Sequence, residues 1–234
     1  MATESPSDVR RTAQPVPPPG VERVWFGRVT ELAADALAHR QVLDAGERAR
    51  LDGFLRPVDR DAYAVGHVAL RRLLGARLGV EPAEVVMERR PCAHCDKPHG
   101  RPVVPGDPVH FSLSHTAGGV LIALAATAVG VDIEGRPSAS AVDDIAGQLH
   151  PRERAELAGF ASEERQWAFA RCWTRKEAYL KATGAGLTED LSLTHVGAGP
   201  VPAGVPGWSI TDVRTDPGYA AAVAVAVGEP AAAS

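Results

Sequence analysis

The chain is poor in cysteine and has no excess of basic residues. It contains only three cysteines, Cys92, Cys95 and Cys172. A set this sparse, and odd in number, fits a reducing compartment better than a disulfide framework. The formal net charge is -4, which gives no bulk attraction to a polyanion. Nucleic acid is therefore not an expected partner.

Long apolar runs and a secretory signal are also missing. No stretch approaches the roughly 18 consecutive apolar residues typical of a membrane-spanning helix, and the N-terminus has no apolar signal segment. We therefore expect a cytoplasmic protein with no membrane association. With 45% hydrophobic and 23% charged residues, the composition is that of a globular protein able to bury one sizeable core or two small ones.

An internal repeat divides the chain. GERARLDGF (46–54) matches RERAELAGF (152–160), and YAVGHVALRRLLG (63–75) then lies alongside WAFARCWTRKEAY (167–179). Chance similarity between helices rich in Ala, Arg and Leu is one explanation, and duplication is the other. We favour duplication, and predict an α+β fold of two similar halves related by a pseudo-twofold axis, each with one long helix packed on a small sheet.

Strand signals occur in both halves. VWFGRV opens the first half, VHFSLSH, TAGG and VLIALAATAVGVDIE form a hairpin-like pair, and GWSITDVR, DPG and YAAAVAVAV repeat that pattern. The predicted organisation is a disordered leader over 1–20, an N-terminal α+β half over 21–127, a C-terminal α+β half over 128–228 and a flexible tail over 229–234.

Two acidic residues end the apolar segment GVDIE. In a strand Asp132 and Glu134 face the same side, while Val131 and Ile133 face the other. The two acidic Cα atoms should lie roughly 6.6 Å apart, a spacing from which both carboxylates can reach one small cation. A strand end that simply emerges into solvent is the alternative.

The helical segment WTRKEAYLK places Glu177 and Lys181 on the same stripe as Trp173 and Leu180. One interpretation is an ordinary i,i+4 ion pair, worth only about 0.2–0.5 kcal/mol. However, an acid placed beside apolar side chains that face the core usually has a partner or a metal ion.

The three acids would need a cation if they met. Each like-charge contact near 4 Å between Glu177 and Asp132 or Glu134 costs on the order of 4 kcal/mol at an effective dielectric constant of about 20. A set of oxygen ligands favours Mg²⁺ or Mn²⁺, with positions left for water and substrate phosphates.

The first half supplies candidate cations and donors. Arg101 lies in HGRPVV, and Ser114 and His115 lie in FSLSHTAG. Neighbouring strand residues point to opposite faces, so Ser114 and His115 are poorly placed as nucleophile and base, which disfavours serine hydrolase chemistry. His115 could instead be a structural hydrogen bonder. Arg48 and Arg50 could be solvated, or could hold a phosphate near a helix start.

The segment CAHCDKPH contains Cys92, Cys95 and His99. A C-x-x-C pair is half of a usual zinc site, but no second half follows in the sequence. A structural zinc site and an ordinary loop both remain open. Cys172, beside Trp173, is expected to be a small buried hydrophobe.

Taken together, HGRP, FSLSHT, GVDIE and WTRKEAYLKATGAGL, in this order and at these separations, resemble the Sfp-type phosphopantetheinyl transferases. The resemblance covers about residues 21–228. It implies an enzyme that moves the phosphopantetheine arm of coenzyme A to a serine hydroxyl of an acyl, peptidyl or aryl carrier protein, releasing adenosine 3′,5′-bisphosphate. It also implies a cofactor cleft between the halves. Since one chain supplies both walls, we expect a monomer.

The resemblance also implies roles for individual residues. Asp132, Glu134 and Glu177 would hold Mg²⁺, or Mn²⁺ in its place, against the coenzyme A pyrophosphate. Glu177, directly or through a water molecule, would deprotonate the serine, and Lys181 would neutralise phosphate charge. The cofactor-binding residues would be Arg48, Arg50, Gly100, Arg101 (in place of the family's lysine), Pro102, Ser114, His115, Asp132, Lys176 and Lys181.

Two other functions remain open at this point. One is a non-catalytic module that binds coenzyme A or a nucleotide, in which the acids are structural. The other is a metal-dependent phosphohydrolase in which water, rather than a serine hydroxyl, attacks the phosphate.

Overall fold

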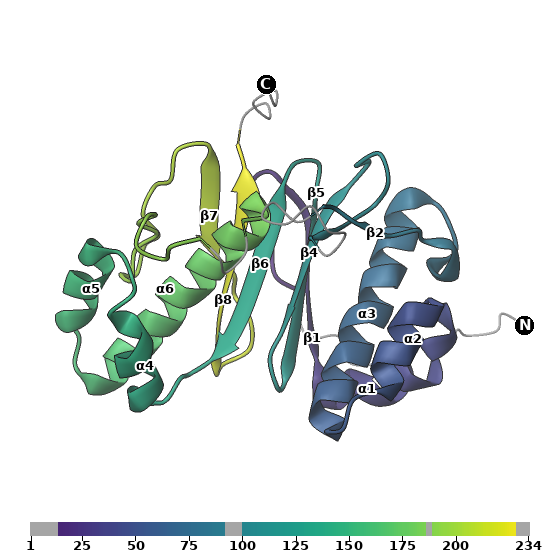
Figure 1. The fold of residues 1–234 in the computed structure, drawn as a ribbon, viewed down its shortest axis with the longest axis horizontal. Helices are drawn as coiled ribbons and strands as arrows, with labels where there is room; N and C mark the ends of the chain where they lie inside the picture. Colours follow the sequence, from purple (N-terminus) through teal and green to yellow (C-terminus); the bar gives the residue numbers. More distant parts are fainter. Residues whose placement is uncertain (1–13, 92–99, 186–188, 228–234) are drawn as a thin grey trace, which may run out of the picture.

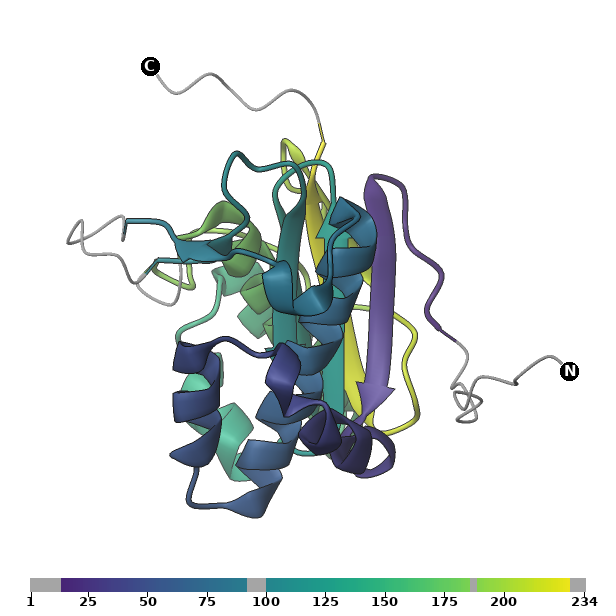
Figure 2. The ribbon, with the colours of Figure 1, turned by 90° about the vertical axis from the view of Figure 1, so that its right-hand side faces the viewer.

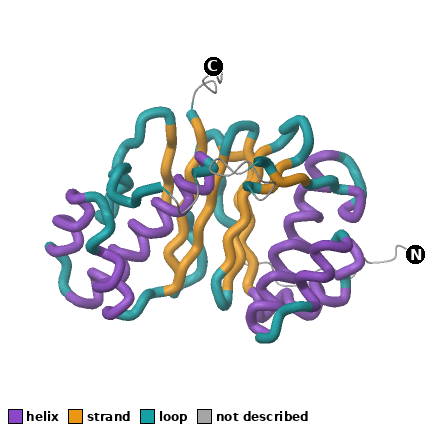
Figure 3. Tube along the Cα trace, in the orientation of Figure 1, coloured by secondary structure: helices purple, strands orange, loops and turns teal. Residues whose placement is uncertain are grey.

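The computed structural model describes residues 14–91, 100–185 and 189–227. Helices lie on both outer sides of the molecule and strands lie between them (Figures 1 and 3). The first half contains β1 (Val21–Arg28), α1 (Val29–Ala38), the 3₁₀ turn η1 (Arg40–Val42), α2 (Ala45–Asp52), α3 (Pro57–Leu78), the 3₁₀ turn η2 (Pro82–Glu84), β2 (Glu88–Arg89), β3 (Pro102–Val103), β4 (His110–His115) and β5 (Gly119–Ala125).

The second half repeats this arrangement. It contains β6 (Val129–Gly135), α4 (Ala139–Ala146), α5 (Pro151–Ala158), α6 (Ser162–Thr183), β7 (Trp208–Asp212) and β8 (Tyr219–Ala226). The strand orders are β1-β5-β4 and β6-β8-β7, and β2 pairs with β3 separately. In each half the first and last strands pair antiparallel. The predicted α+β fold class is confirmed.

The two short helices that precede the long ones begin in the same way. At the start of α2 the Asp44 side chain accepts a hydrogen bond from the backbone of Glu47, and the Glu47 side chain accepts one from the backbone of Asp44. At the start of α5 His150 and Glu153 form the equivalent reciprocal pair. Such capping boxes satisfy backbone N–H groups that have no partner inside the helix.

The long helices α3 and α6 correspond in length and in burial. Each has 22 residues. Within 64–71 and 168–175 the partly exposed positions coincide: His67 and Ala69 in α3, Arg171 and Trp173 in α6, while the other residues of both segments are buried. The repeat seen in the sequence therefore extends to the packing of these helices.

The two three-stranded sheets pack face to face, and the long helices cover their outer faces. The apolar core between the sheets includes Phe26, Leu121, Val131, Ile133 and Val223. Figure 2, which looks onto the N-terminal half, shows α1, α2 and α3 in front of the strands. The molecule therefore has four layers, in the order helices, sheet, sheet, helices. The face of each sheet that points away from the other sheet is buried under helices.

Strands β4 and β6 belong to different sheets but run next to each other. The buried Ser112 hydroxyl on β4 accepts a hydrogen bond of 3.0 Å from the backbone N–H of Val131 on β6. We refer to this line of contact between β4 and β6 as the seam. Successive side chains of β4 point to opposite faces of the sheet. Those that point away from α3 join the two halves at the seam.

Helix α6 lies unusually close to β6. A Cβ atom on Gly130 would be 2.0 Å from the carbonyl oxygen of Ala178 and 2.5 Å from the nitrogen of Ala182. Ala222 and Ala224 on β8 pack with the same two helix alanines. Small side chains therefore allow the backbone of the helix to approach the sheet, since a larger residue would need that space.

Two parts of the predicted layout differ from the structure. The segment 120–134, expected as one arm of a hairpin, forms two strands in different sheets, β5 and β6. Residues 14–20, assigned to a disordered leader, lie against β1: the Gln14 amide bonds both the N–H and the carbonyl of Phe26 at 3.0 and 3.1 Å. The polar composition of this segment did not reveal these hydrogen bonds between the Gln14 side chain and the backbone of β1.

None of the helices in the described ranges is long and apolar enough to cross a membrane.

We predict that Gly130→Ala destabilises the protein by at least about 2 kcal/mol, because the new methyl group must push α6 away from β6. Chemical denaturation measures the free energy of unfolding. Gly147→Ala is the matched control, since nothing lies within 4 Å of the Cβ it would add and its φ of -62° is ordinary for alanine. Equal stability of the two variants would contradict the close approach.

Candidate active site

Three polar residues from three elements meet at the seam. Ser114 on β4 donates a hydrogen bond of 2.7 Å to Oδ1 of Asp132 on β6. Lys181 on α6 donates to the same oxygen at 2.5 Å and to the Ser114 hydroxyl at 3.1 Å. Asp132 is 4% exposed and Lys181 is 33% exposed, so the carboxylate is enclosed while the ammonium reaches toward solvent.

Helix α6 places a second carboxylate beside Asp132. Glu177 lies one turn before Lys181 and is buried. Burial and then the neighbouring charge of Asp132 raise the pKa of Glu177, while Lys181 partly opposes the shift. The structure thus brings Asp132, Glu177 and Lys181 together, as their positions in the sequence predict.

Glu134 is the third acid of this group. Loss of water, followed by repulsion from Asp132 and from Glu177, raises the pKa of Glu134 to about 7. Lys181 and a hydrogen bond from Thr116 act in the opposite direction. Like charges that are held together without full compensation are typical of sites that recruit a cation.

The donor chemistry fits a small divalent ion. Asp132 Oδ2 and Glu177 Oε1 are buried and have no hydrogen-bond partner among the described residues, and leaving a buried acceptor unpaired costs about 1–3 kcal/mol. Anionic oxygens are the ligands that Mg²⁺ prefers. The positions of these two oxygens therefore favour them as ligands.

The predicted convergence of Asp132, Glu134 and Glu177 is not seen as a ready-made cluster. In the ranges that the structure describes, no three His, Cys, Asp or Glu side chains are grouped to hold a metal ion. At Asp132 Oδ1 the counter-charge is instead the ammonium of Lys181. The three acids interact electrostatically.

A groove of 980 Å³ lies beside these acids, between the end of α6 and the first half. Lys181, Thr183 and Gly184 form one wall. The other wall is rich in cations. The basic residues that line the groove are Arg50, His67, Arg89, Arg90, Arg101 and Lys181. A groove of this charge suits a ligand with several phosphates.

Arg101 connects the groove to helix α6. Its Nη1 donates a hydrogen bond of 3.0 Å to the carbonyl oxygen of Ala182, close to the end of α6. Burial, and then the charge of Arg90, lower the pKa of Arg101. Gly100 and Pro102 line the groove on either side of Arg101. The predicted phosphate-binding segment therefore also holds the helix that carries Glu177 and Lys181.

His115 is exposed, and follows the buried Ser114 on β4. Partial loss of water and then the nearby charges of His67, Lys181 and Arg50 lower the pKa of His115. The opposite orientations of Ser114 and His115 agree with the argument against a serine hydrolase. The shared influence of these cations places His115 near the groove.

Two predicted cofactor ligands are engaged elsewhere. Lys176 is 2% exposed and bonds Glu153 at 3.0 Å and the carbonyl oxygen of Thr194 at 2.6 Å. The Nη1 atom of Arg48 donates to the carbonyl oxygen of Leu43. Neither side chain lines the groove, so both assignments are corrected. They fail because the sequence does not show which helical positions face neighbouring loops.

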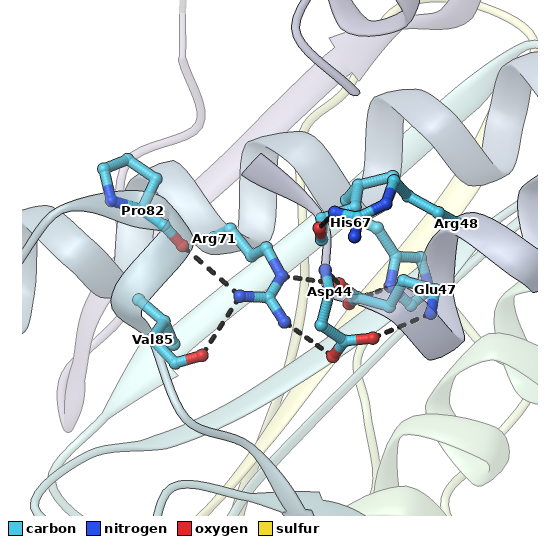
Figure 4. Close-up of polar contacts among 8 residues, drawn as sticks. Asp44, Glu47, Arg48, His67, Arg71, Pro82 and Val85 are labelled. Atoms are coloured by element: carbon cyan, nitrogen blue, oxygen red, sulfur yellow. Dashed lines mark hydrogen bonds and ion pairs between the residues drawn. The ribbon is translucent and has the colours of Figure 1, made fainter. Parts of the chain in front are cut away.

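A buried arginine supports the groove wall (Figure 4). Arg71 is 1% exposed and bonds Glu47 at 2.5 Å, Asp44 at 2.8 Å and the carbonyl oxygens of Val85 and Pro82 at 3.0 and 3.3 Å. This guanidinium fastens α2 and the segment after η2 to α3. In the sequence Arg71 lies in the repeated segment 63–75 and corresponds to Arg175 of 167–179, and this match was the available signal.

The second half is fastened by comparable buried charges. Arg175 bonds both oxygens of Asp212 at 2.7 and 2.5 Å and the carbonyl oxygens of Gly197 and Gly199 at 2.8 and 2.9 Å. With the Lys176–Glu153 pair, this fixes α5, β7 and the connecting segment to α6. Arg175 and Lys176 directly precede Glu177 in α6. Their contacts hold Glu177 in position, and neither residue lines the groove.

The predicted zinc ligands Cys92, Cys95 and His99 lie outside the described residues. Cys172 is fully buried, and burial is the main cause that raises the pKa of its thiol.

Comparison with known proteins gives a consistent result. A family model described as "4'-phosphopantetheinyl transferase superfamily" matches residues 128–223. The chain is 34% identical over 195 residues to "4'-phosphopantetheinyl transferase HetI" of Nostoc, covering 79% of this chain and 78% of that protein. It is 27% identical over 189 residues to "4'-phosphopantetheinyl transferase Sfp" of Bacillus subtilis, covering 77% and 80%. It is 34% identical over 139 residues to "4'-phosphopantetheinyl transferase gsp" of Aneurinibacillus migulanus, covering 57% and 54%.

The raised pKa of Glu134 predicts a pH dependence of stability. A carboxyl whose pKa is higher in the folded chain binds its proton more tightly there. Its contribution is therefore present below the ordinary value of 4.5 and is lost as the pH rises to about 7. Allowing for partial contact with water, the loss should be about 1–2 kcal/mol.

Glu134→Gln should flatten this decline, which urea unfolding at several pH values across the window would measure. Glu163→Gln is the control, because Glu163 is 78% exposed on the same helix as Glu177 and pairs with Arg136. An unchanged pH profile in Glu134→Gln would show that the acids do not repel one another as described.

Proposed function

Because the chain belongs to the 4'-phosphopantetheinyl transferase superfamily, we propose that it transfers the phosphopantetheine arm of coenzyme A to a serine hydroxyl of a carrier protein in a magnesium-dependent reaction. Family membership favours this transferase over a non-catalytic binding module or a phosphohydrolase. The observation that carries the proposal is the contact of Asp132 with Ser114 and Lys181, beside Glu177 and at the edge of a cationic groove.

The proposed reaction replaces a phosphoanhydride bond of coenzyme A by a phosphate ester bond to the carrier protein. The serine oxygen forms a bond to the phosphorus that carries the pantetheine arm, and the bond from that phosphorus to the bridging pyrophosphate oxygen breaks. The serine proton passes to a base, and adenosine 3′,5′-bisphosphate leaves. In such reactions a protein contributes mainly alignment of the reacting atoms and compensation of charge.

Asp132 and Glu177 are the proposed metal ligands with the strongest support, because each has a buried oxygen without a partner. Glu134 would complete the set after a side-chain rotation, since it already feels the charge of both. Magnesium, or manganese in its place, would supply positive charge at the pyrophosphate and orient it for displacement.

Glu177 is the proposed general base, directly or through a water molecule. Its raised pKa makes this carboxylate a stronger proton acceptor than an ordinary glutamate. Lys181 lies one turn further along the same helix face. Its ammonium is partly exposed and can offset charge on the departing bridging oxygen, while Arg101 would hold the phosphates from the opposite wall of the groove. His115, which interacts electrostatically with Lys181, would assist at the pyrophosphate.

The remaining proposals concern partners. The acceptor is an acyl, peptidyl or aryl carrier protein. A single chain supplies both walls of the groove, and so we infer that the monomer is active. Incubation with coenzyme A, Mg²⁺ and a panel of apo carrier proteins, followed by mass spectrometry, would detect the added arm. Hydrolysis of coenzyme A without labelling of any carrier would indicate a phosphohydrolase instead.

We predict that Asp132→Asn and Glu177→Gln each lower the rate of carrier labelling at least about 100-fold, because they remove charge and a base from the reacting centre. Affinity for coenzyme A, measured by calorimetry without carrier, should change much less. Glu163→Gln, an exposed substitution on the same helix, should label at the wild-type rate. Wild-type turnover in both acid variants would rule out these roles.

Removal of divalent metal should abolish labelling, since Asp132, Glu134 and Glu177 then repel one another and the pyrophosphate. Activity should return when Mg²⁺ or Mn²⁺ is added after dialysis against a chelator. Glu177→Gln should not be rescued by either ion. Full labelling in the presence of excess chelator is the result that would refute metal dependence.

A further inference from the structure

The Ser114 hydroxyl is enclosed in the seam between two charged groups. Ser114 is 7% exposed. Its hydroxyl lies 2.7 Å from Oδ1 of Asp132 and 3.1 Å from the ammonium nitrogen of Lys181. An ammonium can only donate and an ionised carboxylate can only accept, so the single hydrogen atom of the hydroxyl must point at Asp132. Ser114 therefore has no donor left for a phosphate oxygen.

The position of Ser114 also argues against the cofactor-binding role that the resemblance implies for it. The residues of β4 that line the groove, within the described part of the chain, are Phe111, Ser112 and Leu113. Ser114 follows them and contacts β6 instead. Its partner is thus a carboxylate of the reacting centre rather than a ligand in the groove.

The two oxygens of the Asp132 carboxylate differ in their partners. Oδ1 accepts hydrogen bonds from both Ser114 and Lys181. Oδ2 is buried and has no partner in the ranges that the structure describes. A carboxylate is a rigid plane, so a donor that fixes Oδ1 also restricts the direction in which Oδ2 points. Oδ2 is one of the two oxygens with the strongest support as a metal ligand.

The two donors at Oδ1 differ in their freedom to move. Lys181 has a long flexible stem and is 33% exposed. In the proposed reaction its ammonium turns to phosphate charge, and its bond to Oδ1 then weakens. Ser114 has one heavy-atom side-chain torsion and is buried on a strand that Ser112 also bonds to β6. The hydroxyl is therefore the donor that stays at Asp132 when the ammonium moves.

We propose that Ser114 is a positioning residue for the metal site. It holds Oδ1 of Asp132 so that Oδ2 remains directed at the bound ion while Lys181 compensates phosphate charge. This inference rests on the proposed function and deepens it. Removing a residue that orients a metal ligand by a hydrogen bond commonly lowers metal affinity about 10- to 100-fold.

Two other roles for Ser114 give different results. A direct ligand of coenzyme A would affect binding of coenzyme A when no metal is present. A hydroxyl that only joins the two sheets would affect the free energy of unfolding and leave metal affinity unchanged. A positioning residue affects metal affinity and leaves metal-free binding of coenzyme A as it is.

The test uses the full chain and measures Mn²⁺ binding by calorimetry, with and without saturating coenzyme A. Ser114→Ala is the main variant, because it leaves the Lys181–Asp132 pair in place. Ser114→Cys is a second variant that largely fills the same space with a much weaker donor. Ser138→Ala is the control, since Ser138 is exposed, caps α4 by accepting a 3.1 Å bond from the Ala141 N–H and does not line the groove.

We expect both Ser114 variants to bind Mn²⁺ about tenfold more weakly, or worse. The Mg²⁺ concentration that gives half of the maximal labelling rate should rise by a similar factor. At saturating Mg²⁺ the KM for coenzyme A should stay within about twofold of the wild-type value, because the lost contact is not with coenzyme A. Ser138→Ala should unfold more easily and bind Mn²⁺ as the wild type does.

Wild-type Mn²⁺ affinity in the two Ser114 variants, or an equal loss in Ser138→Ala, would overturn the inference. Weaker binding of coenzyme A by Ser114→Ala in the presence of a chelator would also overturn it, since that result indicates a direct contact.

The wild type separates this failure from failure of the proposed function. If the wild type binds Mn²⁺ and labels a carrier protein while the Ser114 variants match it, the transferase stands and the role of Ser114 is wrong. If the wild type neither binds Mn²⁺ nor labels any carrier of the panel, the proposed function fails first.

Discussion

The close approach of α6 to β6 at Gly130 determines the geometry of everything around it. The backbone of the helix at Ala178 and Ala182 occupies the space that a side chain at position 130 would need. Glu177 and Lys181 flank this contact on the helix, and Asp132 follows it by two residues on the strand. Because Gly130 has no side chain, Glu177 and Lys181 of α6 come close to the carboxylate of Asp132 on β6. The packing of the helix on the sheet thus positions these charged groups.

The charges gathered by this packing are not balanced locally. Ser114 and Lys181 both donate hydrogen bonds to Asp132, whereas burial and repulsion raise the pKa values of Glu134 and Glu177. Such a group of acids lowers the stability of the folded protein, because burying neighbouring carboxylates costs more free energy than burying each one apart from the others. Buried ion pairs support the surrounding elements in both halves, Arg71 with Asp44 and Glu47 in the first and Arg175 with Asp212 in the second.

The sequence predicted most of the fold and the centre of the site, and the reasons are specific. The alternation in GVDIE and the spacing of Glu177 and Lys181 are local periodicities, so they can be recognised in the sequence without knowledge of the tertiary structure. The side chains of Arg48 and Lys176 were misassigned because their partners, Leu43 and Thr194, are backbone carbonyls that no pattern marks. The contacts of His67 were also not predictable, since they are a stack on Tyr63 of the same helix and an ion pair with Glu47 of α2. Long-range partners of polar side chains are the information that a single sequence leaves out.

The hydrogen bond from Arg101 to the carbonyl oxygen of Ala182 ties the segment before β3 in one half to the end of α6 in the other. A guanidinium can point one nitrogen at this carbonyl and another at a ligand, whereas an ammonium at the same position would have to share a single nitrogen between them. Substitutions at position 101 and in the last turn of α6 should therefore be inherited together. At this contact the two halves depend on each other, and relatives with lysine here should carry a compensating change where the helix terminates.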